Sequence, residues 1–369
     1  MVVTIQPPRR FLFGPGPSMV EPDVYEAIAQ PVVGHLDPYF FEIVGQTREL
    51  LRQVFGTRNE VTIAISGTGS SGMETAVGNF VEPGSKFAVF ANGYFCDRLT
   101  EMGRRQGAQV ARLEKPWGET FNDQEAGEFL QRERPGVVAF VHAETSTGAL
   151  QDPRPICNAA RAVDALVIAD TVTSLGAIPV NVDEAGIDVA YSCSQKGLSC
   201  PSGLAPFTAS PRAMERLKAR KSLVREWYLD LSLLGDYYDG PHRYHHTASS
   251  SMFYALCRSL QLITEEGLQN RFDRHFRSHL SLVRGLEDLG LRMHVAEGHR
   301  IPNLNTPRVP EGVDDARVRK HLLEKYGIEI AGGLGPLAGR IFRIGLMGPL
   351  ANEDCIRMFL GAFQTALKA

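Results

Sequence analysis

The chain has 369 residues, of which 43% are hydrophobic and 22% are charged, and its formal net charge is -3. This composition is typical of a folded globular protein and excludes a disordered chain. Lysines and arginines are scattered among acids, and the longest apolar runs fall far short of the roughly 20 residues that span a bilayer, so neither a nucleic-acid partner nor a membrane is expected.

The first half of the chain alternates between short apolar runs, typical of strands, and segments with helical spacing. The predicted strands are 61–65, 86–90, 108–113, 137–141 and 166–169. The predicted helices are 21–30, 40–55 and three segments that begin near Arg98, Gln124 and Pro155. This alternation predicts an α/β fold with a mostly parallel sheet sandwiched by helices.

After about Asp188 the pattern changes, and the rest of the chain is expected to form two short strands, two long helices and an α+β unit. The expected elements are strands at 189–192 and 205–209, helices from near Ser249 and Gln269, strands near Leu291, Asn303 and Phe342, and a last helix from Asn352. The predicted organisation is an N-terminal arm (1–20), a large domain (21–265) and a small C-terminal domain (266–369).

The six cysteines contain no CxxC pair and no regular framework, which predicts free thiols in a reducing compartment. Arg9-Arg10 resembles a twin-arginine signal, but Gly14 to Pro17 interrupts the apolar segment that such a signal needs. A cytoplasmic location is therefore expected.

The turn Ser66-Gly-Thr-Gly-Ser-Ser-Gly72 lies between a predicted strand and a predicted helix. Small residues let backbone N–H groups approach an anion, and a helix N-terminus favours negative charge. The turn lacks the lysine of a nucleotide-binding P-loop, so a phosphate cradle of another kind is the functional interpretation. An ordinary structural turn is the alternative.

Asp170 and Lys196 each follow a short strand. Four apolar residues deliver Asp170 to a strand end, where ligands bind in parallel sheets, although a helix cap would also explain a single aspartate there. Lys196 lies among small residues, whereas most lysines are solvated. A desolvated amine can form a Schiff base, so a phosphate cradle, a partner for a ring nitrogen and an imine lysine together indicate pyridoxal 5'-phosphate (PLP).

The chain resembles the class V, fold type I aminotransferases, specifically the alanine/serine-glyoxylate group, over nearly its whole length. The motifs that carry the resemblance are Gly14-Pro-Gly-Pro-Ser18, Gly34-His-Leu-Asp-Pro38, Ser66-Gly-Thr-Gly69, Asn92-Gly-Tyr-Phe95, His142-Ala-Glu-Thr-Ser-Thr-Gly148, Asp170, Ser194-Gln-Lys196, Tyr244-His-His-Thr247, Gly332-Gly-Leu-Gly-Pro336 and Phe342-Arg-Ile-Gly-Leu346.

The resemblance implies a set of site residues. Lys196 and Asp170 are implied to be catalytic, with Asp170 on the cofactor's ring nitrogen. The other implied cofactor contacts are Thr68, Gly69, Ser70 and Gln195 at the phosphate, Phe95 stacked on the ring, Thr145 at the ring hydroxyl, and Tyr244 and Thr247 donated by a second subunit of a homodimer. Arg343 is implied to bind the substrate carboxylate, and Gly16 to line the substrate pocket.

Two other features of the sequence could also form a site or an interface. His245-His246 invites a metal reading, but adjacent side chains of an extended segment are expected to point opposite ways, so no metal site is predicted. The aromatic segment from Trp227 to Leu234 is interpreted as dimer interface or core packing.

The predicted function is transfer of an amino group from a small amino acid, alanine or serine, to glyoxylate or pyruvate. A ureidoglycine-glyoxylate aminotransferase is the first alternative. The resemblance implies that this subgroup carries Asn where this chain has Tyr244, which favours the alanine/serine group. A cysteine desulfurase would need a mobile cysteine, and Cys355 falls in the predicted last helix. A non-catalytic PLP-binding regulator is the rival of another class.

Overall fold

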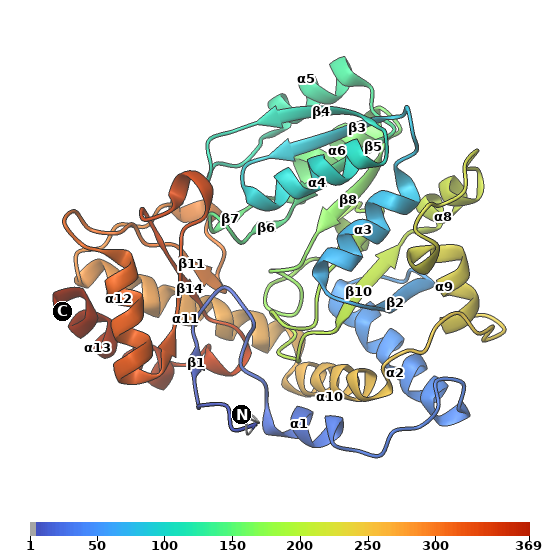
Figure 1. Ribbon diagram of the computed structural model, residues 1–369. Coiled ribbons are helices and arrows are strands. Elements are labelled where there is room, and N and C mark those ends of the chain that lie inside the picture. Colours follow the sequence, from blue (N-terminus) through green and yellow to red (C-terminus); the bar gives the residue numbers. More distant parts are fainter. Residues whose placement is uncertain (1–4) are drawn as a thin grey trace, which may run out of the picture.

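The computed structural model describes residues 5–369 and is built around one seven-stranded sheet (Figure 1). In pairing order, the strands are β2 (Val61–Ser66), β10 (Leu204–Ala209), β9 (Val189–Tyr191), β8 (Leu166–Asp170), β5 (Val137–Val141), β3 (Lys86–Ala91) and β4 (Gln109–Glu114). Within this sheet only β10 runs antiparallel to its neighbours. The mostly parallel sheet predicted from the sequence is confirmed.

Helices cover this sheet, so its central strands are apolar along their whole length. Every residue of β5 is buried, and β8 is buried up to and including Asp170. The helices of this part are α1 (Pro22–Ile28), α2 (Pro38–Phe55), α3 (Gly69–Phe80), α4 (Tyr94–Arg105), α5 (Asp123–Glu133), α6 (Pro153–Ala162), α7 (Val182–Ala185), α8 (Pro211–Lys218), α9 (Leu231–Tyr238) and α10 (Ser250–Glu266). No helix within residues 5–369 is long and apolar enough to cross a membrane.

Two helices begin earlier than predicted. Helix α4 begins at Tyr94, not near Arg98. Helix α6 begins at Pro153, where Asp152 accepts a hydrogen bond from a backbone N–H of the first turn and proline supplies the helical φ angle.

The C-terminal region lies beside the large sheet (Figure 1). It contains α11 (Leu268–Asp288), α12 (Asp315–His321), α13 (Glu353–Lys368) and a three-stranded antiparallel sheet of β11 (Leu304–Asn305), β14 (Phe342–Gly345) and β13 (Ala331–Gly332). The strand predicted near Leu291 is wrong. Only an isolated bridge, between Met293 and Pro307, forms there, and Leu291 is buried in the C-terminal core instead.

The described residues form two large hydrophobic cores and a small third cluster of Ala143, Ile301 and Leu304. The first surrounds the large sheet and extends to Ile263, and the second is built from the C-terminal region together with Phe13. The N-terminal segment joins the second core because β1 (Phe11–Leu12) pairs in parallel with β12 (Ile328–Glu329). The domain ranges predicted from the sequence stay predictions.

The cysteines are all free thiols, as predicted, and five of the six are buried. Burial raises the pKa of Cys157 and of Cys193 to about 12, so these thiols stay protonated. Cys355, the sixth, is half-buried in α13.

Candidate active site

A cavity of about 140 Å³ opens at the carboxyl edge of the large sheet. It lies where β5 and β8, which run in parallel, both end. Its lining is Thr68, Gly69, Ser70, Met73, Phe95, Arg98, Val141, Thr145, Asp170, Val172, Gln195 and Lys196. The sheet therefore brings most of the sequence-predicted site residues together, as expected for ligand binding at strand ends.

Asp170 is the buried acid of this cavity. Burial raises the pKa of its carboxyl to about 7, although two hydrogen bonds favour the charged form. The backbone N–H of Val172 donates to Oδ1 and the phenol of Tyr191 donates to Oδ2, each at 2.9 Å. A carboxyl held in this way is poised to pair with a cation placed in the cavity.

Tyr191 was not among the residues predicted from the sequence. It is buried in β9, and β9 pairs with β8 so that Tyr191 lies directly across from Asp170. The sequence shows that Asp170 and Tyr191 each end a short strand. It does not show that the two strands are neighbours in the sheet, which is what makes the residues partners.

Lys196 presents its amine to the same cavity. Burial lowers the pKa of this amine, and the positive charge of Arg343 lowers it further, while Asp170 opposes the shift. The amine donates a hydrogen bond to the backbone carbonyl of Pro15. Gly16 lies close by, and a Cβ atom added there would come within 2.9 Å of the amine nitrogen.

The glycine turn between β2 and α3 forms one wall of the cavity. Thr68 occupies the position before α3 but makes no side-chain cap. The N–H groups of Ser71 and Gly72 donate to its carbonyl, so those of Gly69 and Ser70 are available to an anion. Gly69 approaches the neighbouring strand ends, since a Cβ there would lie 3.1 Å from Val172. Arg98 adds a cation beside this turn, with 3.4 Å between its Nη1 and the Ser70 hydroxyl.

Arg98 was also missed in the sequence, although a signal was present. It follows Phe95 by three residues and therefore lies on the same face of α4. Its guanidinium carbon is 5.1 Å from the centre of the Phe95 ring.

Glu144, a buried residue that was not predicted to belong to the site, holds the backbone of Phe95 and of Ser146. Glu144 accepts hydrogen bonds from the backbone N–H groups of Phe95 at 3.2 Å and of Ser146 at 2.9 Å. Burial raises the pKa of its carboxyl. Thr145 hydrogen-bonds to the hydroxyl of Thr173.

Arg343 reaches this region from β14 of the C-terminal sheet. Its side chain is largely buried, and it donates to the carbonyl oxygens of Gly332 at 2.7 Å and of Thr145 at 3.4 Å. A guanidinium therefore lies beside a residue that lines the cavity, although Arg343 itself is not part of the lining.

Tyr244 and Thr247 are the predicted residues that the fold does not bring to the cavity of the same chain. Tyr244 is 63% exposed and Thr247 is also exposed. Their assignment to a neighbouring subunit's site stays a prediction.

The His245 and His246 side chains do not point opposite ways, so the expected geometry was wrong. Their rings meet edge to face, with 2.9 Å between the two Nδ1 atoms, and the segment is not part of a strand. Within residues 5–369 no group of three or more possible metal ligands is found. The neighbouring segment Trp227–Leu234 forms a short helical turn and the start of α9, in which Trp227 is exposed and Leu229 is buried.

The sheet topology and the C-terminal region are those of the fold type I transferases, and the comparisons with known proteins give the family. Residues 10–365 match the model of the family described as aminotransferase class-V. The chain belongs to this family.

Individual relatives match over nearly the full length. A solved alanine-glyoxylate aminotransferase from Nostoc sp. is 44% identical, with a TM-score of 0.98 over 100% of this chain and 97% of that one. An alanine-glyoxylate aminotransferase from Drosophila melanogaster is 38% identical over 98% of this chain and 93% of its own length. A (S)-ureidoglycine-glyoxylate transaminase from Bacillus subtilis is 37% identical over 98% of this chain and 91% of its own length.

This family implies PLP, and the residues of the cavity fit that group. The buried Asp170 carboxyl has no cation of its own among the hydrogen bonds it accepts. The Gln195 side-chain oxygen is buried without a hydrogen-bond partner in the described chain. A desolvated amine and a free helix N-terminus complete a set of groups suited to an aldehyde, a ring nitrogen and a phosphate.

Proposed function

We propose that this chain is a PLP-dependent aminotransferase that moves the amino group of alanine or serine to glyoxylate or pyruvate, acting in the cytoplasm. The observation that carries the proposal is that the desolvated Lys196 amine and the buried Asp170 carboxyl line one cavity. The names of its relatives from Nostoc and Drosophila support the choice of alanine and glyoxylate.

When bound, PLP supplies an aldehyde that reacts with amines and a protonated ring that draws electrons from the Cα–H bond of an amino acid. The Asp170 carboxylate would face the ring nitrogen and keep its proton in place. The Lys196 amine, whose pKa is lowered by burial, would take the proton from the substrate Cα and move it to the cofactor carbon C4′.

The other roles follow from chemistry and position. Arg343 would hold the α-carboxylate of the substrate with two parallel hydrogen bonds. Phe95 would stack on the ring and Thr145 would reach the ring hydroxyl. The phosphate would be held by Thr68, Gly69, Ser70 and Gln195, together with Tyr244 and Thr247 of the partner subunit in a homodimer.

A second candidate, transfer from ureidoglycine to glyoxylate, is favoured by one observation. The Bacillus subtilis ureidoglycine relative is 37% identical, almost the same as the 38% of the Drosophila alanine relative. Tyr244 speaks for the first candidate, because the resemblance places Asn at this position in the ureidoglycine group.

The test is a half-reaction screen of the purified protein loaded with PLP. We expect visible absorbance from the bound cofactor, and loss of that absorbance when alanine or serine is added. Ureidoglycine in the same screen decides between the two candidates.

Lys196→Ala should abolish the half-reaction, whereas the matched control Lys218→Ala, an exposed lysine of α8, should leave it intact. Full transamination by Lys196→Ala would overturn the proposal.

A further inference from the structure

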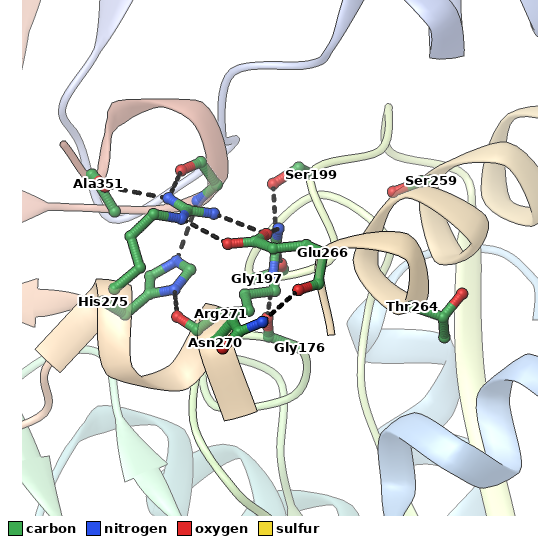
Figure 2. Close-up of polar contacts among 12 residues, drawn as sticks. Gly176, Gly197, Ser199, Ser259, Thr264, Glu266, Asn270, Arg271, His275 and Ala351 are labelled. Carbon is green, nitrogen blue, oxygen red and sulfur yellow. Dashed lines mark hydrogen bonds and ion pairs between the residues drawn. The ribbon is translucent and has the colours of Figure 1, made fainter. Parts of the chain in front are cut away.

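A buried ionic cluster lies where the large sheet meets the C-terminal region (Figure 2). Its centre is Arg271, in the first turn of α11, which is only 5% exposed. Its Nη1 lies 2.9 Å from a carboxylate oxygen of Glu266, the last residue of α10. Glu266 also pairs with Arg274 at 2.6 Å. A buried arginine needs such a partner, because an unpaired charge in the interior is costly.

Arg271 also joins two loops of the candidate active site. Its Nε donates to the carbonyl of Gly176 at 2.6 Å, and its Nη2 donates to the carbonyl of Gly197 at 2.9 Å (Figure 2). Gly197 directly follows Lys196, and Gly176 lies within the loop that joins Asp170 at the end of β8 to α7. One rigid guanidinium thus bridges the loops that carry the two predicted catalytic residues.

These two loops are packed closely against each other. A Cβ atom on Gly197 would collide with the carbonyl of Leu175 and lie 3.0 Å from the backbone nitrogen of Ala177. The two loops therefore have little room to move past each other. The guanidinium of Arg271 fixes the distance between the carbonyl groups of Gly176 and Gly197.

The same helix turn contacts the segment that follows β14, the strand of Arg343. Arg274 donates to the carbonyl of Gly348 at 2.8 Å, and the N–H of Gly348 donates to the ring of His275 at 3.2 Å. Burial lowers the pKa of His275 to about 3, so this ring is a neutral acceptor. The start of α11 is thus connected to both the Lys196 loop and the strand of Arg343.

We propose that Arg271 is a positioning residue, which fixes Lys196 relative to Asp170 and, through the first turns of α11, relative to Arg343. It lies outside the cavity lining, so it acts through these residues and does not touch the substrate. The inference rests on the roles given to Lys196, Asp170 and Arg343 in the proposed function.

The test uses Arg271→Lys, which keeps the charge for Glu266 but cannot bridge two carbonyls with a planar fork. For the enzyme loaded with PLP we expect kcat to fall about 10- to 100-fold, with KM for the amino donor changed less than about threefold. The pH midpoint of the visible absorbance should also shift. Arg277→Lys, on the exposed face of α11, is the matched control and should match the wild type.

A second readout uses the protein without PLP. The rate at which an amine-reactive reagent, trinitrobenzenesulfonate, labels Lys196 is followed against pH by mass spectrometry. Arg271→Lys should change the pH midpoint of this labelling, and Arg277→Lys should not. Wild-type kcat, absorbance midpoint and labelling in Arg271→Lys would overturn the proposal.

If Arg271→Lys does not fold, the double variant Arg271→Met with Glu266→Gln takes its place, because it removes the buried arginine together with its carboxylate partner and leaves only Arg274, which is partly exposed to water. Wild-type labelling of Lys196 in that variant would overturn the proposal, and an altered midpoint would support it. A wild-type protein that takes up no PLP would instead contradict the proposed function, and the labelling comparison would still decide the role of Arg271.

Discussion

Asp170 sits in a place that is unfavourable for a carboxylate on its own. Its pKa of about 7 reflects burial at the end of β8, and the hydrogen bonds from Val172 and Tyr191 offset only part of that cost. Such a group gains stability from a cation, so the site is arranged for a charged ligand more than for the stability of the empty protein.

The first prediction concerns Asp170→Asn in the protein without PLP. The folded-state pKa lies above the ordinary value of 3.8, so this group's favourable contribution to stability is complete below about pH 4 and is lost as the pH rises to about 7. The amide of the Asp170→Asn variant does not ionise, so the variant does not lose stability as the pH rises. We expect the variant to be more stable than the wild type at pH 8 by a few kcal/mol, at most about 4, with a smaller gap at pH 5.

Urea unfolding of both proteins at the two pH values measures this difference. Equal stability of the two proteins at pH 8 would contradict the burial argument.

The same variant should lose transamination, since an amide cannot balance the charge of a protonated ring nitrogen.

A second prediction at this scale concerns Tyr191→Phe, which removes only the hydroxyl that donates to Asp170. A hydrogen bond to a charged group is worth about 1.5–3 kcal/mol, so we expect the affinity for PLP to fall roughly 10- to 100-fold while the protein stays folded. Absorbance titration with PLP measures the affinity. Tyr254→Phe, a buried tyrosine of α10 outside the site, is the control, and an equal loss there would point to a general packing effect.

At the scale of elements, the start of α3 has two features that suit an anion. Its first backbone N–H groups are free of a side-chain cap, and Gly69 lies close to Val172 and Cys193. Gly69→Ala should weaken binding of PLP about tenfold or more, because its Cβ would lie 3.1 Å from Val172 and 3.3 Å from Cys193 and the turn would have to shift. The matched control is Gly127→Ala inside α5, where the Cβ meets nothing within 4 Å.

The control should bind PLP normally and gain up to about 1 kcal/mol of stability from the better helix propensity of alanine. Both effects are measured by PLP titration and thermal unfolding. Unchanged PLP affinity in Gly69→Ala would show that this turn does not form the phosphate cradle.

At the scale of the whole molecule, the exposed positions of Tyr244 and Thr247 pose the question of a shared active site. If the site is completed by a partner subunit, a mixture of Lys196→Ala and Tyr244→Ala chains, each weak alone, should regain activity. A hybrid dimer then contains one site with an intact Lys196 and an intact Tyr244 of the partner subunit. Dissociation, mixing and reassembly followed by a transamination assay measures this recovery, and no recovery would place Tyr244 outside a shared site.

Much of the fold could be predicted from the sequence because its signals are local. The buried parallel strands are continuous apolar runs, and the turns after them carry glycine, Asp170 and Lys196 at the strand ends. The prediction of a strand near Leu291 was wrong because its local signal is ambiguous. An apolar residue after a helix is equally compatible with a strand and with a core position.

The sequence by itself determined the α/β class and the positions of the glycine turn, Asp170 and Lys196 after strands of the sheet, since each depends on neighbouring residues in the chain. Only the tertiary structure decided which distant groups meet. Tyr191 reaches Asp170 from the adjacent strand, Arg343 reaches Thr145 from a different sheet, and Arg271 bridges Gly176 and Gly197 from a helix that follows both. These contacts join residues far apart in the sequence, and no local periodicity encodes them.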